Sequence, residues 1–139
     1  MLQHASMERK QIVIAYIKHQ EKFLLVKRSA WVNSFKHQWS AITGRIEMHE
    51  DALHSALREI EEETGLSEDQ VVLIKRGIAF EAKMKDKVRI IHPFLFATEI
   101  DSVTLNWENS DYLWVSPDQM KNVETVEGVG STLINLIHE

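Results

Sequence analysis

Apolar residues along most of the chain are spaced as in β-strands. Residues 11–18 and 23–28 are β-branched and apolar runs typical of buried strands, and the polar turn between them predicts a hairpin. Further strands are expected over residues 39–43, 71–84, 88–100 and 112–115, with polar loops or turns over residues 29–38, 84–87 and 106–111. Gly77 predicts a bulge or a break in the strand over residues 71–84, and Pro93 predicts a local edge or bulge.

One segment has helical spacing instead. Its apolar residues recur at steps of three and four, which indicates one buried helix face: Leu53, Ala56, Leu57 and Ile60. We expect this helix to begin near Glu50 and to end at a C-cap on Gly65. Ser116, followed by proline, indicates another helix start, and residues 131–138 predict an amphipathic helix.

Strands and helices interleaved in this way predict an α/β fold in which helices cover both faces of a mixed sheet. A chain of 139 residues is long enough for one domain with a core and too short for two ordinary domains. We therefore expect a single domain over residues 1–139, with a frayed end over residues 1–10.

The composition narrows the range of partners. A hydrophobic fraction of 44% and a charged fraction of 27% are typical of a soluble globular protein, and no apolar run has the length of a membrane span. The formal charge of −5 disfavours a long nucleic acid as partner, whereas a small phosphate ester with its own metal ion is compatible. Because the chain has no cysteine, disulfides and thiolate chemistry are excluded, and the cytoplasm is the simplest location.

Three carboxylates gather along one margin of the predicted helix. At about 100° per residue, Glu59, Glu62 and Glu63 fall within an arc of roughly 100° beside the apolar face. Like charges at this spacing repel one another, so the helix gains no stability from them. A hard divalent cation, which prefers oxygen ligands, would reverse that penalty. Glu61 points toward solvent and is expected to be a bystander.

The residues around these carboxylates follow a fixed spacing. A glycine is followed after five residues by a glutamate, and after seven more by Arg-Glu, an apolar residue, any residue, Glu-Glu, any residue, a glycine and an apolar residue. The fixed positions in this chain are Gly44, Glu50, Arg58, Glu59, Ile60, Glu62, Glu63, Gly65 and Leu66. This complete pattern resembles the Nudix box of the MutT-like Nudix hydrolase family. The resemblance implies an α/β/α sandwich with a mixed sheet, in which the box forms a loop, a helix and a loop. It extends more loosely to residues 108–115, and Arg45 stands where many members have a second glycine.

The resemblance also implies the chemistry. Family enzymes hydrolyse nucleoside diphosphate derivatives by attack of water on phosphorus, with Mg²⁺ as cofactor and Mn²⁺ as an acceptable substitute. Glu62 and Glu63 are then the leading metal ligands, and the Gly44 carbonyl is a further candidate ligand. Glu59 is a metal ligand or the general base. Arg58 belongs to the catalytic set because its planar fork can hold a box carboxylate in position.

Several further residues are candidates for the site. Glu108 matches a downstream glutamate that some family members use for metal binding or catalysis, so it competes with Glu59 for the role of base; the ordinary alternative is an exposed loop carboxylate. Glu50 is expected to secure the loop of the box. The candidate substrate-binding residues, chosen for contact with phosphate or base, are Arg28, Arg45, Phe35 and Trp39. Trp31 and Trp107 could also stack on a base, although packing is the commoner role for each tryptophan alone.

Two functions from different classes fit the sequence. The first is Mg²⁺-dependent hydrolysis of a pyrophosphate bond in a nucleoside di- or triphosphate-type small molecule. The alternative is a Nudix-fold module that binds a nucleotide or sugar nucleotide without hydrolysing it. We expect such a module to have lost box carboxylates, and because this chain has all of them, the sequence favours the enzyme. The family resemblance also makes a homodimer an option.

Overall fold

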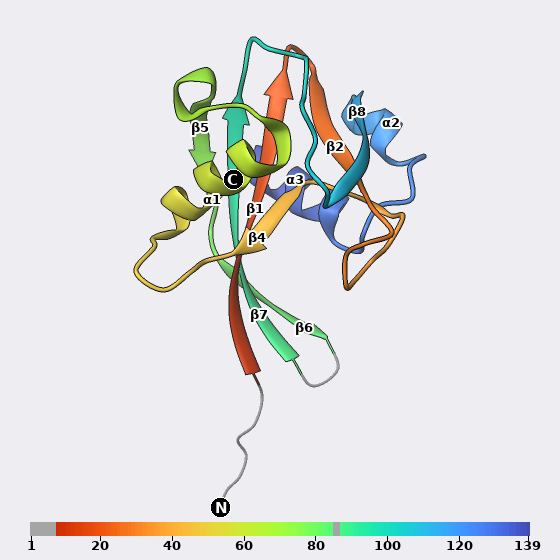
Figure 1. Cartoon of the computed structure of the whole chain (residues 1–139). Helices are drawn as coiled ribbons and strands as arrows, with labels where there is room; N and C mark the ends of the chain where they lie inside the picture. Colours follow the sequence, from red (N-terminus) through yellow and green to blue (C-terminus); the bar gives the residue numbers. More distant parts are fainter. Residues whose placement is uncertain (1–7, 85–86) are drawn as a thin grey trace, which may run out of the picture.

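The structure is a computed structural model that describes residues 8–84 and 87–139 (Figure 1). Within these residues the strands form one sheet: β1 (Glu8–His19), β2 (Lys22–Arg28), β3 (Trp39–Ser40), β4 (Ile42–Arg45), β5 (Val72–Arg76), β6 (Phe80–Met84), β7 (Lys87–Ala97) and β8 (Asn109–Val115). The helical segments are α1 (Ala52–Thr64), the short 3-10 helix η2 (Glu68–Gln70), α2 (Pro117–Met120) and α3 (Val129–His138).

The two longest strands form the centre of the sheet. β1 and β7 run parallel, with Glu8 opposite Lys87 at one end and Lys18 opposite Ala97 at the other. The remaining pairs are antiparallel and extend the order β3-β2-β1-β7-β5, with β4 on β1, β6 on β7 and β8 on β2. The predicted mixed sheet is therefore confirmed, as is the hairpin between β1 and β2.

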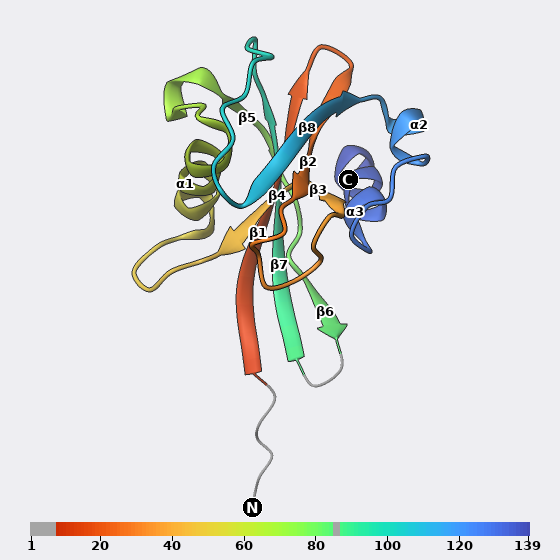
Figure 2. The same ribbon diagram turned by 45° about the vertical axis from the view of Figure 1, so that its right-hand side comes forward.

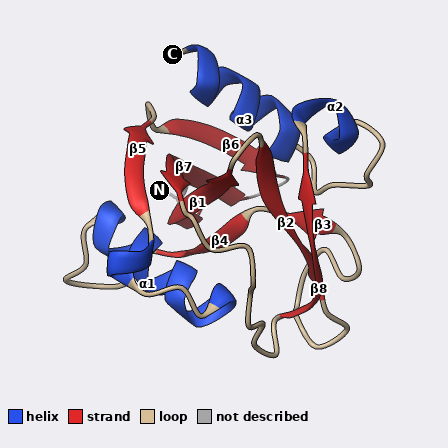
Figure 3. Ribbon diagram, turned by 90° about the horizontal axis from the view of Figure 1, so that it is seen from above, coloured by secondary structure: helices blue, strands red, loops and turns tan. Residues whose placement is uncertain are grey.

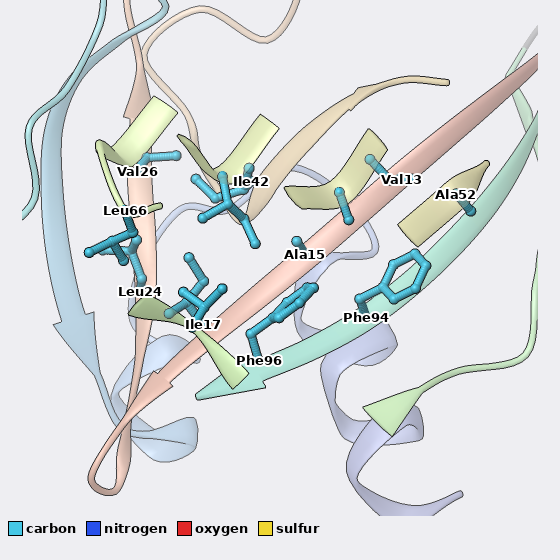
Figure 4. Packing of buried hydrophobic residues seen from close by; sticks show 13 residues of the cluster. Val13, Ala15, Ile17, Leu24, Val26, Ile42, Ala52, Leu66, Phe94 and Phe96 are labelled. Carbon is cyan, nitrogen blue, oxygen red and sulfur yellow. The ribbon is translucent and has the colours of Figure 1, made fainter. Parts of the chain in front are cut away.

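Helices cover both faces of this sheet, as the view from above shows (Figure 3). α1 packs on one face over a cluster of buried apolar side chains, including Val13 and Phe94 (Figure 4). α2 and α3 pack on the opposite face over a second cluster, which includes Tyr16 and Leu133. Because alternate residues of β1 enter the two clusters, both faces of the strand are buried, which explains its continuous apolar sequence. The expected α/β/α sandwich is confirmed.

The first strand starts earlier than its apolar run. Residues 8–10 pair with the first three residues of β7, so they belong to the sheet and not to a frayed end. Because backbone pairing does not require apolar side chains, the polar residues 8–10 can form a strand that the apolar pattern does not predict. The rest of the segment that we expected to be frayed, residues 1–7, lies outside the described residues.

The predicted break at Gly77 is confirmed, because β5 ends before it and β6 begins after it. A Cβ atom on Gly77 would lie 2.7 Å from Leu136 Cδ1 and 2.8 Å from Pro93 Cγ, so no larger residue fits there without movement. Pro93 is not on an edge strand, since β7 has β1 on one side and β5 and β6 on the other. It lies opposite the break between β5 and β6, and the register shift is in β5, between Leu73 and Lys75.

Other element boundaries differ by a few residues. The strand expected over residues 39–43 is divided into β3 and β4, and α3 begins two residues before the predicted helix. β8 begins at Asn109, inside a predicted loop, because Asn109 pairs with Arg28 of β2. The predicted turn at residues 84–87 includes residues 85 and 86, which lie outside the described residues. No helix in the described part of the chain is long and apolar enough to cross a lipid bilayer.

Candidate active site

Helix α1 supplies most of the candidate catalytic carboxylates. Its N-cap is Asp51, whose side chain accepts a hydrogen bond from His54 N at 2.8 Å, so the helix begins slightly later than predicted. Gly65 ends it in the left-handed conformation with φ of 78°, as expected. Glu59 and Glu63 are buried, whereas Glu61 and Glu62 are exposed.

Gly44 lies directly against one of these carboxylates. A Cβ atom on Gly44 would lie 2.1 Å from both Cδ and Oε2 of Glu59. β4 holds Gly44 in this position by pairing with β1, where it lies opposite Val13. Glycine is required here for close approach and not for a positive φ, because φ of Gly44 is not in the left-handed region. The sheet therefore brings the first glycine of the box to the helix.

Arg58 connects the loop of the box to the helix. Its Nε and Nη2 donate to the two carboxylate oxygens of Glu50 at 2.6 and 2.9 Å, a bidentate pair. Its Nη1 donates to Glu59 Oε2 at 3.0 Å and to Glu62 Oε2 at 3.4 Å. Hydrogen bonds from Arg58 are the main reason that the pKa of Glu50 is lowered to about 2. One guanidinium thus fixes three box carboxylates and keeps Glu50 ionised.

A second element completes an acidic cluster. One carboxylate oxygen from each of Glu59, Glu62 and Glu108 lies within 4.8 Å of the other two. The chain that leads from β7 to β8 passes beside α1 (Figure 2), where Thr104 N donates to Thr64 O at 2.9 Å. Glu108 is at the end of that segment, immediately before β8. The three oxygens form a ligand set that could hold a divalent cation.

Glu63 lies behind this cluster and is 3% exposed. Its Oε1 accepts a hydrogen bond from Asn109 Nδ2 at 2.9 Å, while its buried Oε2 has no hydrogen-bond partner among the described residues. Burial, followed by the negative charge of Glu108, raises the pKa of Glu63 well above its usual range. Burial also raises the pKa of Glu59, against the opposing effect of Arg58. Burial is the largest cause of both shifts, so the surroundings of these two carboxyl groups disfavour their ionised forms.

The predicted substrate-binding residues lie in different places. Arg28 is within electrostatic range of Glu63 and Glu108, and its Nε donates to Ser34 O at 2.8 Å. The side chain of Arg45 is exposed, while its carbonyl accepts a hydrogen bond from Arg58 Nη2 at 3.1 Å. Because φ of Arg45 is not positive, this position does not require the second glycine of other family members.

Of the two aromatic candidates, Phe35 is half-buried in the loop after β2 and has a positive φ of 56°. Trp39 packs against the cluster beneath α2 and α3, on the face of the sheet opposite α1. The structure therefore brings the Arg28 side chain toward the carboxylates, whereas Trp39 lies on the other face of the sheet. Because the Cβ position of Gly44 faces Glu59, the side chain of Arg45, the next residue of β4, points to that other face as well.

Asn109 is the site residue that the sequence did not reveal. It is buried and contacts Glu63 across 46 positions of sequence. Its place directly after Glu108 is the available signal, but the polar sequence of residues 106–111 predicts a loop. Its side chain faces Glu63 because β8 starts at this residue and pairs with β2.

This fold and site match known proteins. The NUDIX domain family matches residues 8–134. The chain belongs to this family. Rat (Rattus norvegicus) bis(5'-nucleosyl)-tetraphosphatase [asymmetrical] is 28% identical to this Nudix protein over 116 residues, which are 81% of this chain and 76% of the rat protein. The predicted family is thus confirmed, and the family match together with the hydrolase relative confirms the expected enzyme class, a Nudix pyrophosphohydrolase.

Solved structures agree with the Nudix fold. The MutT protein from Methanosarcina mazei Go1 superposes with a TM-score of 0.82 at 22% identity, covering 96% of each chain. A C. elegans Ap4A hydrolase in a binary complex superposes with a TM-score of 0.72 at 21% identity, covering 91% of this chain and 93% of that one. At this level of identity the similarity establishes the fold alone.

Proposed function

We propose that this Nudix protein is an Mg²⁺-dependent enzyme that hydrolyses a pyrophosphate bond in a nucleotide-type small molecule. The observation that carries the proposal is the approach of Glu59, Glu62 and Glu108, with one oxygen from each within 4.8 Å of the others. Carboxylates at this separation repel one another, and the single charge of Arg58, which contacts Glu59 and Glu62, offsets only part of three negative charges. Mg²⁺, which binds through oxygen ligands, would offset the rest. Mn²⁺ accepts the same ligands and is expected to substitute.

Two further features support a cation at this place. The buried Glu63 Oε2 has no partner among the described residues, and such a group needs a cation or a proton nearby. Because Gly44 has no side chain, the Glu59 carboxylate can lie directly against its backbone. The carbonyl oxygen of Gly44 is therefore included as a further proposed ligand. The proposed metal-binding residues are Gly44, Glu59, Glu62 and Glu63, together with Glu108.

The roles of the residues follow from their positions. Bound Mg²⁺ would neutralise phosphate charge and lower the pKa of a bound water molecule. Glu59 and Glu108 both face the cluster, so either can accept the proton of the attacking water. Arg58 keeps the Glu59 and Glu62 carboxylates oriented through its hydrogen bonds. Arg28, which is within electrostatic range of Glu63 and Glu108, adds positive charge at the border of the site for the phosphates of the substrate.

The relatives suggest which substrates to test first. The rat relative is named a bis(5'-nucleosyl)-tetraphosphatase and the C. elegans structure an Ap4A hydrolase. We therefore place dinucleoside polyphosphates first and nucleoside triphosphates second among substrates for this enzyme. The proposal includes a cytoplasmic location, which suits a chain without cysteine, and it leaves the homodimer as a prediction.

A substrate screen tests this function. The purified protein is incubated with Mg²⁺ and either diadenosine tetraphosphate, nucleoside triphosphates or sugar nucleotides, and the products are identified by mass spectrometry. We expect cleavage that requires Mg²⁺, stops with EDTA and falls by a factor of at least about 100 in Glu62→Gln. Glu61→Gln is the matched control, because Glu61 is an exposed neighbour of Glu62 on the same helix but does not belong to the acidic cluster, and it should retain activity.

The same screen separates the enzyme from the sensor module. Binding of a nucleotide without turnover across the whole panel would favour the module and contradict the proposal. Unchanged turnover in Glu62→Gln would contradict the assignment of the carboxylates.

A further inference from the structure

Two of the four tryptophans have exposed side chains on the two chain segments that meet at Glu108. Trp31 is 80% exposed and Trp107 is 64% exposed, whereas Trp39 packs against the core. Packing, the ordinary role of a tryptophan, therefore does not account for Trp31 and Trp107. Tryptophan is enriched at surfaces where proteins contact their partners, because its ring combines a large apolar area with a polar N–H group.

A single buried hydroxyl joins the backbones of these two residues. Ser29 Oγ donates to Trp107 O at 2.8 Å and accepts a hydrogen bond from Trp31 N at 3.2 Å. Ser29 is only 5% exposed, and its own backbone N donates to Glu108 O at 2.9 Å. The loop after β2 and the segment before β8 are thus held together at the point where both tryptophans project from the surface.

The loop that carries Trp31 is also tied down at its base. Arg28 N donates to Gln38 O at 2.9 Å, and His37 N donates to Arg28 O at 2.8 Å, so the loop is closed where it leaves the sheet. The guanidinium of Arg28 holds its interior through Ser34 O at 2.8 Å. Hydrogen bonds therefore fix the backbone of Trp31 relative to β8. Less backbone entropy is then lost when a ligand binds to this loop.

Trp107 directly precedes a member of the acidic cluster. Asn106 Nδ2 donates to Glu108 Oε1 at 3.2 Å, and Glu108 N donates to Asn106 Oδ1 at 3.0 Å, so the three residues form one fixed segment. A nucleotide whose phosphates lie at the cluster carries its base a few bonds away. An indole ring offers a π face to any base.

We propose that Trp31 and Trp107 form a base-stacking site that holds the nucleobase of the substrate beside the acidic cluster. The inference rests on the proposed function for the position of the phosphates. Because stacking uses the face of the base and not its hydrogen-bonding edge, the site accepts either purine, and it requires that the substrate contain a base.

Binding measurements test this site independently of turnover. The full chain is titrated calorimetrically with ATP and with inorganic triphosphate, in Mg²⁺ and in the Glu62→Gln background, so that hydrolysis does not interfere. We expect Trp31→Ala and Trp107→Ala each to weaken ATP binding by about tenfold, with Phe at either position restoring most of it. Affinity for inorganic triphosphate, which has no base, should stay within about twofold of the parent protein in all these variants.

Ile78→Ala is the matched control, since Ile78 is 74% exposed on another part of the surface and its loss should leave ATP affinity unchanged. An equal loss of ATP and triphosphate affinity in the tryptophan variants would overturn the inference. Unchanged ATP affinity in these variants would also overturn it, and so would a parent protein that binds ATP no better than triphosphate. Tight, tryptophan-dependent ATP binding by a wild-type protein that hydrolyses nothing in the substrate screen would support the stacking site while contradicting the proposed enzymatic function.

Discussion

At Glu63, the stability of the metal-free fold favours a neutral side chain, whereas the proposed metal site requires a charged one. The residue is almost fully buried, one of its oxygens has no partner among the described residues, and Glu108 and Glu59 add negative charge nearby. Its pKa is raised in the folded protein, so the fold loses stability as pH rises above the pKa of an unfolded glutamate, about 4.3. A cation would remove this cost, which connects metal binding to stability.

We therefore expect Glu63→Gln to stabilise the metal-free protein by about 1–2 kcal/mol at neutral to alkaline pH. The amide keeps an oxygen for Asn109 Nδ2 and adds a donor toward Glu59. Urea unfolding in EDTA measures the gain, which should disappear below about pH 4, where both side chains are neutral. The same variant should lose affinity for Mn²⁺ in calorimetric titration. A variant that is less stable than wild type at neutral pH would show that ionised Glu63 carries no such cost.

At the scale of elements, the site depends on how closely β4 approaches α1. Gly44 Cα is held opposite Val13 by the sheet, and the Glu59 carboxylate occupies the space where a Cβ would lie. The atoms that a Cβ on Gly44 would meet belong to the end of the Glu59 side chain and not to the backbone. A larger residue would therefore displace the carboxylate before it disrupted the fold.

From this contact we expect Gly44→Ala to fold with a stability loss of only about 1 kcal/mol and to bind Mn²⁺ at least about tenfold more weakly. Calorimetric titration with Mn²⁺ and thermal unfolding measure the two effects. Gly130→Ala is the control, because a Cβ there meets nothing within 4 Å and its metal affinity should be unchanged. Wild-type affinity in Gly44→Ala would contradict the close approach as a requirement of the site.

Sequence reasoning succeeded for elements whose determinants are local. The apolar spacing predicted helix α1, and Gly65 marked its end, because capping and periodicity depend on neighbouring residues. It did not identify Asn109 as the partner of Glu63, since that contact depends on the register of β8 against β2. The packing of Trp39 and the exposure of Trp31 likewise depend on which face of the sheet each loop reaches, and local sequence does not determine that.

At the scale of the whole molecule, the acidic cluster joins two distant parts of the chain. Glu59 and Glu62 come from α1, while Glu108 arrives on the segment before β8, which crosses the sheet to lie beside the helix (Figure 2). Ser29 and Asn109 fix that segment to the loop after β2 and to Glu63. The box is thus part of a site that only the folded sheet completes.

The contribution of Glu108 to turnover is the most direct test of this account. On the best substrate from the screen, with Mg²⁺, we predict that kcat/KM of Glu108→Gln falls by a factor of about 100 or more. Asp111→Asn removes an exposed carboxylate three residues further along, in β8, and should stay within about twofold of wild type. If Glu108→Gln retained the activity of Asp111→Asn, the cluster of three carboxylates would not be the catalytic centre.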